Sequence, residues 1–202
     1  MSEYTISYCA GQPDWSKLPT LEMTYAYRKT PDYIRAFGQF AWDEQAIHVH
    51  LRIKVKQIRA VETGPYGMPC EDSCLEFFFC PVPGDPRYLN IEFNFNGCMY
   101  LGMGSGLPDL TRLIPDQEGN PFSPQIQKTE TGWEIFYQIP YSFIRRFFPA
   151  FAPIPGMTVR ANCYTCSDLS DEPYYKSWSE VKCQPFTFHC TESFGFMIFS
   201  NL

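Results

Sequence analysis

The sequence predicts an all-β chain, an antiparallel sandwich of two packed sheets with one short helix. Aromatic residues make up 17% of the 202 residues, and aromatic side chains favour strands over helices. The 18 prolines and 13 glycines indicate many turns. Short runs of alternating apolar and polar residues, bounded by turn residues, are typical of antiparallel strands. No repeat or low-complexity linker divides the chain, so we expect residues 1–202 to form one domain.

The first predicted hairpin lies in the N-terminal third of the chain. Residues 34–42 form a strand with Phe40 and Trp42 on one face, and residues 43–45 form a tight turn. Residues 47–55 then alternate strictly between apolar and polar side chains. This alternation predicts an antiparallel strand with one face buried and the other toward solvent.

A second predicted hairpin carries polar side chains on one of its faces. Residues 74–80 and 88–96 form its strands, joined by a turn at residues 81–86. In both strands every second residue is apolar and is expected to face the core. The opposite face carries Glu76 on the first strand and Glu92 on the second. We therefore expect the two carboxylates on neighbouring strands, away from the core.

Local patterns predict further strands, one helix and loops in the rest of the chain. Strands are expected at residues 125–130, 133–139, 157–166 and 194–199. A short helix is expected at residues 140–148, where apolar residues recur at helical spacing. Residues 97–125 and 167–175 are expected to be loops, because glycine, proline or acidic residues are frequent there. Trp15 is expected to be buried beneath an N-terminal loop.

Charge and hydropathy argue against two classes of partner. The formal net charge is −6 and the longest basic cluster is Arg145-Arg146, whereas nucleic acids are bound by basic surfaces. No apolar run approaches the ~18 residues that predict a membrane helix. The segment from Met1 to Ala10 lacks the basic and apolar regions of a secretory signal, so a cytoplasmic location is expected.

The nine cysteines are interpreted as reduced thiols that act as small hydrophobic residues, because their number is odd and no secretory signal is found. Cys163 and Cys166 form the only Cys-x-x-Cys motif, but residues three apart on a strand point to opposite faces. Cys183 and Cys190 are too far apart in sequence to supply the second pair of a zinc site. The spacing therefore argues against structural zinc.

Two histidines on one predicted strand form a second candidate metal site. His48 and His50 project from the same face, a geometry that can bind a metal ion. Arg52 and Lys54 continue that face and would repel a cation. An ordinary solvent-facing strand is therefore the preferred interpretation.

Four short motifs occur in a fixed order between about residues 30 and 200. The first, Asp72-Ser73-Cys74-Leu75-Glu76-Phe77-Phe78, is similar to an Asp-Ser-x-Val-Glu-x-Phe block. The others are Asn90 to Asn94, Arg160 to Tyr164, and Trp178-Ser179 followed by Phe188-His189 and Phe194-Gly195. Together they resemble the carbohydrate-binding modules of family 9, in particular the family 9-like branch.

The resemblance implies a β-sandwich without catalytic residues that binds a terminal sugar of a glycan and serves carbohydrate catabolism. In the family two tryptophans clamp the sugar ring, and the corresponding positions fall here at Cys70 and Phe188. Glu76 matches a sugar-facing glutamate and Asn94 a polar partner, while Glu92 stands where well-studied members carry a basic residue. Aromatic faces suit the apolar faces of a pyranose, and polar side chains suit its hydroxyls.

Two further expectations follow from the resemblance. Tyr66, Tyr174 or Tyr175, all in predicted loops, could supply the aromatic faces that the clamp positions lack. The family carries structural calcium, for which residues 168–172 and residues 71–72 offer oxygen ligands, although their spacing is not that of an EF-hand.

The sequence therefore predicts a non-catalytic carbohydrate-binding protein. The expected ligand-binding residues are Glu76, Glu92, Asn94, Tyr66, Cys70 and Phe188. Two alternatives stay open: a glycan-processing hydrolase that uses Glu76 and Glu92 as an acid and base pair, and a sandwich that binds a ligand other than sugar. No Gly-x-Ser-x-Gly or His-Glu-x-x-His motif supports an enzyme.

Overall fold

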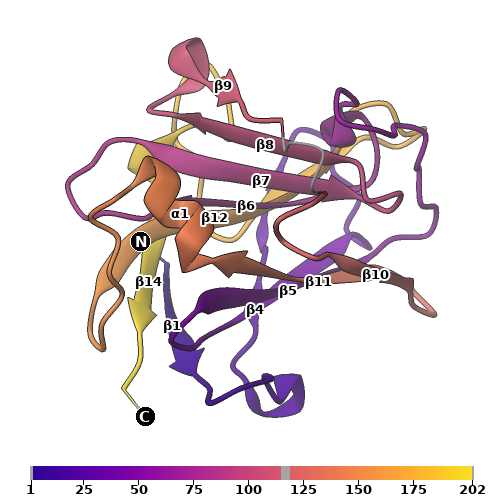
Figure 1. Ribbon diagram of the computed structural model, residues 1–202. Helices are drawn as coiled ribbons and strands as arrows, with labels where there is room; N and C mark the ends of the chain where they lie inside the picture. Colours follow the sequence, from indigo (N-terminus) through magenta and orange to yellow (C-terminus); the bar gives the residue numbers. More distant parts are fainter. Residues whose placement is uncertain (1, 115–118, 202) are drawn as a thin grey trace.

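The structure, a computed structural model, describes residues 2–114 and 119–201, and these are folded into strands with one α-helix (Figure 1). The prediction of an all-β chain with one short helix is thereby confirmed. The strands are β1 (Glu3–Tyr8), β2 (Leu21–Glu22), β3 (Tyr25–Tyr27), β4 (Arg35–Trp42), β5 (Ala46–Lys54), β6 (Cys74–Cys80), β7 (Tyr88–Asn94), β8 (Met99–Gly104), β9 (Thr111–Arg112), β10 (Gln125–Lys128), β11 (Gly132–Pro140), β12 (Thr158–Ser167), β13 (Tyr174–Ser177) and β14 (Gly195–Phe199).

The helical segments are short. The α-helix α1 spans Tyr141–Phe147, and single turns of 3-10 helix lie at Trp15–Lys17 (η1), Pro69–Glu71 (η2), Leu107–Asp109 (η3) and Thr191–Ser193 (η4). No helix among the described residues is long and apolar enough to cross a membrane.

The strands form two walls that face each other. One wall, called here the β5 wall, has the antiparallel order β10-β11-β5-β4, with β2 beside β4. The other, called the β6 wall, has the antiparallel order β14-β12-β6-β7-β8-β9, with β13 also paired to β12 and β3 paired to β13. In Figure 1 the β6 wall lies above the β5 wall.

Strand β1 joins the two walls, which corrects one part of the prediction. Its first four residues pair in parallel with β14, and its last two residues pair in parallel with β4. The result is one curled, mixed sheet of 14 strands in the described residues, so two separate antiparallel sheets are not confirmed. Alternation of polar and apolar residues shows which face of a strand is buried, and it carries no information on which strand is its neighbour.

The main core lies between the walls and is rich in aromatic side chains. Phe40 of β4 and Phe77 of β6 approach to 4.7 Å between ring centroids, and Phe93 of β7 lies 5.3 Å from Tyr137 of β11. Such ring pairs contribute about 0.5–1.5 kcal/mol beyond the area they bury. The alternating positions of the predicted hairpins therefore point inward as expected.

A second apolar layer covers the outer face of the β6 wall. Phe78, Tyr88 and Tyr164 project from this face and pack against Phe194 and other residues of the segment that follows β13. Both faces of β6 and β7 are consequently buried along their whole length. The expected polar face is present, but it is enclosed by the C-terminal segment and does not face solvent.

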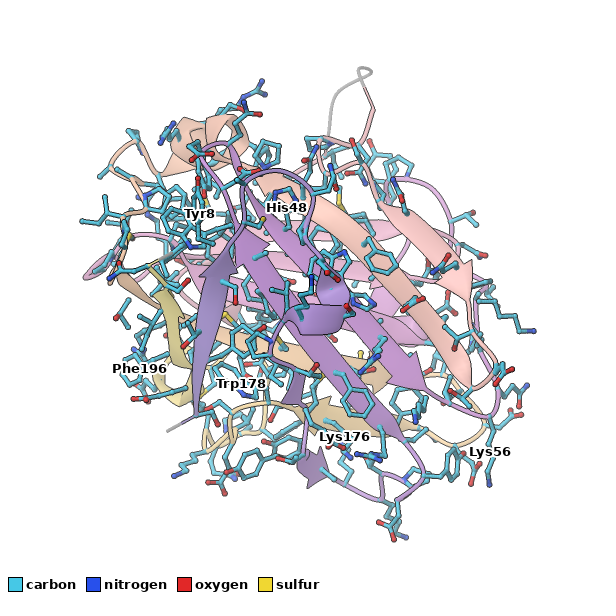
Figure 2. All side chains as sticks on the ribbon, turned by 90° about the horizontal axis from the view of Figure 1, so that it is seen from below. Tyr8, His48, Lys56, Lys176, Trp178 and Phe196 are labelled. Atoms are coloured by element: carbon cyan, nitrogen blue, oxygen red, sulfur yellow. A yellow bond between two sulfur atoms is a disulfide. The ribbon has the colours of Figure 1, made fainter. Side chains whose placement is uncertain are left out.

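The predicted solvent-facing histidines are also buried. His48 Nε2 lies 2.8 Å from Asp43 Oδ2, and His50 Nε2 lies 2.7 Å from Glu134 Oε2. The ring of His50 stacks on Phe136 with centroids 4.1 Å apart. Each imidazole thus has its own carboxylate partner. Figure 2, which views the β5 wall from outside, shows His48 among the side chains that cover it.

Several strands lie where the sequence predicted loops or no element. β8 and β9 fall within residues 97–125, and β13 begins inside the predicted acidic loop. β1 lies in the N-terminal segment, where no element was predicted. Trp15, expected to be buried, is only partly buried, because η1 rests on the outside of the β5 wall with the indole 5.4 Å from the ring of His50. These short strands depend on tertiary pairing, which local patterns do not report.

Two of the nine cysteines form a disulfide, which corrects the prediction of reduced thiols throughout. Cys183 and Cys190 are bonded across a short loop, with their Cα atoms 6.1 Å apart. The remaining seven are free thiols. A disulfide restricts the unfolded chain, so this bond stabilises the segment that covers the outer face of the β6 wall.

The register between β5 and β11 depends on Gly132. A Cβ atom added there would lie 2.0 Å from the carbonyl oxygen of Ile53, inside any allowed contact. We expect Gly132→Ala to lower the free energy of unfolding by at least about 2 kcal/mol, because main-chain atoms must shift. Gly106→Ala is the matched control, since the nearest atom to its Cβ is 3.6 Å away. Urea unfolding measures both, and equal stabilities of the two variants would contradict the assignment of this contact.

Candidate functional site

A pocket of about 260 Å³ opens on the outer face of the β6 wall. Its floor is made by β6, β7 and β12, and its rim by η2, η3 and the loops before β13 and η4. The lining residues are Arg28, Met68, Cys70, Glu76, Glu92, Tyr100, Leu107, Leu110, Cys166, Asp168, Tyr175, Phe186, Thr187, Phe188 and His189. It brings together residues from distant parts of the sequence.

The floor of the pocket contains two buried carboxyl groups. Glu76 and Glu92 are direct cross-strand neighbours on β6 and β7, and their residues are only 2% and 6% exposed. Glu92 Oε1 accepts a hydrogen bond of 2.8 Å from Asn90 Nδ2, while Glu92 Oε2 has no hydrogen-bond partner among the described residues. Glu76 Oε1 accepts one of 3.0 Å from Cys166 Sγ.

Burial controls the protonation of both carboxyls. It raises the pKa of Glu76 well above its ordinary value, and the nearby Glu92 raises it further. Burial also raises the pKa of Glu92 to about 7, against the opposing effects of the Asn90 hydrogen bond and Arg112. Burying a carboxylate without a cation is unfavourable, so the pair holds protons near neutral pH. The floor can therefore donate as well as accept hydrogen bonds.

Three thiols lie beside these carboxyls. Cys74 of β6 and Cys166 of β12 are direct cross-strand neighbours, and Cys70 of η2 packs against the pair. Cys163, the other cysteine of the Cys-x-x-Cys motif, lies in the main core on the opposite face of β12. The two cysteines of that motif point apart, as the sequence predicts.

One side of the pocket is an aromatic wall. Phe188 stacks on Tyr164 with ring centroids 4.2 Å apart, and Tyr164 Oη donates to the Phe188 carbonyl at 2.9 Å. Phe186 lies 5.5 Å from Phe188, and Tyr175 lies 6.4 Å from it. The guanidinium of Arg28 lies 4.2 Å above the ring of Tyr175. A ligand here meets rings and one cation on this side.

Of the six predicted binding residues, four line the pocket. Glu76, Glu92, Cys70 and Phe188 are brought together from β6, β7, η2 and the C-terminal segment. Tyr175, predicted as a replacement aromatic, lines it as well.

Two predicted binding residues lie outside the pocket. Asn94 is fully buried and donates to Asp72 Oδ2 and to the Glu62 carbonyl, both at 2.8 Å, so its amide anchors a loop. Tyr66 is 77% exposed and is not part of the pocket lining. Tyr174, which was predicted only as a replacement aromatic, is 1% exposed and faces the main core. Loop tyrosines cannot be placed from sequence, because their direction depends on the fold of the loop.

Other lining residues carried no signal in the sequence. Arg28, Tyr100, Phe186 and His189 reach the pocket from four separate segments. Arg28, which has a positive φ of 55°, lies outside every motif identified in the sequence. Of these four, only His189 had a signal in the sequence, because it follows Phe188, which the family resemblance places at a clamp position.

The two segments expected to bind calcium lie side by side, since the N–H groups of Asp168 and Leu169 donate to the carbonyls of Cys70 and Glu71 at 2.9 and 3.1 Å. Two of their acidic side chains already have partners. The Asp72 carboxylate is already satisfied by Arg59 Nη1 at 2.5 Å and by the main-chain N–H groups of Val61 and Glu62. Glu172 accepts from the Tyr33 hydroxyl at 2.6 Å. Within residues 2–114 and 119–201, one group of three possible metal ligands has its ligand atoms within 4.8 Å of one another. It consists of Cys74, Glu76 and Cys166 and includes none of the residues expected to bind calcium.

Fold and pocket together define a β-rich protein with a small pocket on the outer face of one sheet wall. The sequence profile of carbohydrate-binding family 9 matches residues 23–199. Because this match covers most of the chain, the protein belongs to carbohydrate-binding family 9. A comparison with curated proteins gives no match.

Solved structures show the same fold. A candidate carbohydrate-binding protein from Bacteroides uniformis ATCC 8492 is 26% identical, with a TM-score of 0.79 over 98% of this chain and 99% of its own. A family 9 module from Caldicellulosiruptor kristjanssonii in complex with glucose is 14% identical, with a TM-score of 0.68 over 100% of this chain and 97% of its own. The same kind of module in complex with cellotriose is 13% identical, with a TM-score of 0.68 over 100% and 95%.

His189, which lines the pocket, makes the free energy of unfolding dependent on pH. Its Nδ1 lies 2.6 Å from the Tyr88 hydroxyl, and burial lowers its pKa to about 4. The unfolded chain, with an ordinary histidine pKa of about 6.5, binds a proton that the folded chain excludes. Stability is therefore complete above about pH 6.5 and falls as the pH drops toward 4.

We expect His189→Gln to flatten this dependence. The wild type should lose about 1–3 kcal/mol more than the variant between pH 6.5 and pH 4, since each pKa unit corresponds to 1.36 kcal/mol and partial exposure reduces the effect. Urea unfolding at several pH values measures the difference. Parallel pH profiles for the two proteins would show that His189 is not responsible.

Proposed function

We propose that the pocket on the outer face of the β6 wall binds a terminal sugar residue of a glycan or oligosaccharide. The observation that carries the proposal is the joining of carboxyl groups and aromatic rings in one small cavity. Membership of carbohydrate-binding family 9 and the fold shared with modules bound to glucose and cellotriose support it.

The chemistry of the lining suits a pyranose. Glu76 and Glu92 can accept hydrogen bonds from hydroxyls, and a protonated carboxyl can donate one to a hydroxyl or ring oxygen. The rings of Phe188 and Tyr175 can cover the apolar faces of a sugar, where C–H groups project. Arg28 adds hydrogen-bond donors at the rim.

The size of the pocket favours a single sugar unit over a long chain. Its volume of about 260 Å³ lies just below the usual range of small-molecule sites, about 300–1,000 Å³. The floor is closed by β6, β7 and β12, so a polysaccharide cannot pass through it. A chain end entering from the rim is consistent with this shape.

The first testable consequence concerns the carboxyl pair. In Glu76→Gln/Glu92→Gln we expect sugar binding to fall about 10-fold or more, because the hydrogen bonds of two neutral carboxyls are changed and each is worth about 0.5–1.5 kcal/mol. Glutamine has the same shape, so the fold should be kept. Calorimetry with glucose and cellotriose measures affinity, and Glu130→Gln, an exposed position away from the pocket, is the matched control. Unchanged binding in the double variant would refute this site.

The second consequence concerns Phe188. Replacing it in Phe188→Ala should weaken sugar binding about 10-fold, since a stacked ring contributes about 0.5–1.5 kcal/mol beyond its buried area. Phe196→Ala, a partly buried phenylalanine that does not line this pocket, is the control. Thermal unfolding separates a loss of affinity from a loss of fold. Equal affinities for the two variants would remove Phe188 from the binding site.

A glycan array with the purified protein identifies the sugar. We expect selective binding of a set of glycans that share one terminal residue, with calcium or without it. A blank array under both conditions would contradict carbohydrate binding. Hydrolysis through Glu76 and Glu92, the enzymatic alternative, is distinguished by the appearance of new reducing ends during incubation with the bound glycans.

A further inference from the structure

The floor of the pocket holds a cluster of metal-ligating side chains that sugar binding does not explain. Cys74, Glu76 and Cys166 each place one ligand atom within 4.8 Å of the others. All three are buried, with exposed fractions of 0%, 2% and 3%. The hydrogen bond of 3.0 Å from Cys166 Sγ to Glu76 Oε1 already joins two of them.

The position of the three residues is fixed by the sheet. Cys74 and Glu76 are two apart on β6 and therefore project from the same face. Cys166 is opposite Cys74 on the neighbouring strand β12, so its thiol rises beside both. The backbone of two paired strands, β6 and β12, holds the cluster, which is how rigid ligand sites are built.

No basic side chain forms an ion pair with this cluster in the part of the chain that the structure describes, and Arg112 acts on Glu92 without pairing to it. Glu76 makes no ion pair there with a lysine, arginine or histidine, and its cross-strand neighbour is a second carboxyl, Glu92. Glu92 Oε2 is buried and has no hydrogen-bond partner within residues 2–114 and 119–201. Buried carboxyls without compensation are costly, and a bound cation would supply the missing charge.

We propose that Cys74, Glu76 and Cys166 bind a zinc ion at the floor of the pocket. Two thiolates and one carboxylate form a ligand set that selects zinc over calcium or magnesium, which take oxygen ligands. Two sulfur ligands of a tetrahedral zinc ion lie about 3.8 Å apart, given a Zn–S bond of about 2.3 Å. The ligand atoms of the observed cluster lie within 4.8 Å of one another, close to this spacing.

The fourth ligand position of the ion faces the pocket. Cys70 packs against Cys74 and Cys166, and its carbonyl lies 3.5 Å from Cys166 Sγ. Its thiol or a water molecule can complete the tetrahedron. Binding of zinc replaces the protons of the two thiols and the carboxyl, which leave to solvent.

This inference does not depend on sugar binding, and its test contains no sugar. The untagged full chain is reduced, freed of metal and incubated with zinc chloride, and retained zinc is measured by plasma mass spectrometry after desalting. Cobalt chloride replaces zinc in a parallel experiment, where absorption from thiolate-to-cobalt charge transfer reports sulfur ligation. Circular dichroism confirms that each variant is folded.

We expect one zinc ion per wild-type chain and a cobalt–thiolate band. Cys74→Ala, Cys166→Ala and Glu76→Gln should each bind at least about 10-fold more weakly, since even hydrogen-bonded partners of ligands change affinity 10–100-fold. Cys163→Ala is the matched control, a buried cysteine on the other face of β12, and it should bind like the wild type. The variant Cys183→Ala/Cys190→Ala, which removes the disulfide thiols, should also keep the site.

Three results would overturn the proposal. The wild type could retain no zinc and show no cobalt–thiolate band. Cys163→Ala or Cys183→Ala/Cys190→Ala could lose metal as strongly as Cys166→Ala, which would place the ligands elsewhere. Peptide mapping of protein purified without reductant could find Cys74 and Cys166 joined as a disulfide that zinc does not prevent, which would make the pair a redox couple.

Discussion

The packing of the C-terminal segment onto the outer face of the β6 wall is the contact on which the pocket depends. Tyr164 and Phe188 join them through ring stacking at 4.2 Å and a hydrogen bond of 2.9 Å. Without this cover, β6 and β7 would expose both the carboxyls of Glu76 and Glu92 and the rings of Phe78 and Tyr88 to water. With it, the same face becomes the closed floor of a cavity, and the disulfide between Cys183 and Cys190 restrains the covering loop.

The covering segment also changes the electrostatics of the floor. In water, Glu76 and Glu92 would be ionised at neutral pH, and each would have a hydration shell. Enclosed in the floor they lose that shell, which raises both pKa values, and the nearby Glu92 raises that of Glu76 further. A site of this kind favours ligands that bring hydrogen-bond donors or positive charge. The two proposed ligands, sugar hydroxyls and a cation, would each interact favourably with this buried, acidic environment.

The sequence predicted the strands well where one face is apolar, as in β5 and the pair β6 and β7. It placed Glu76 and Glu92 on neighbouring strands correctly, because a hairpin fixes that register. It missed β1, whose parallel partners lie at opposite ends of the chain. It also missed the approach of Cys74 to Cys166, since their strands are separated by 77 residues in which no local pattern records the pairing. The sequence also did not reveal that the polar face is buried, because the segment that covers it has no regular structure.

The substitution at Cys70 connects the two proposals about the pocket. The resemblance to family 9 places an aromatic clamp at this position, and a cysteine there leaves one face of a bound sugar without a ring. The same cysteine packs against Cys74 and Cys166 and gives the floor a third sulfur. Phe188 and Tyr175 keep aromatic surface on the opposite side. We infer that the pocket holds its ligand between an aromatic wall and a floor of thiols and carboxyls, so its selectivity depends on what occupies that floor. A zinc ion there would present its open coordination position to a sugar hydroxyl, whereas a proton-bearing floor would offer only hydrogen bonds.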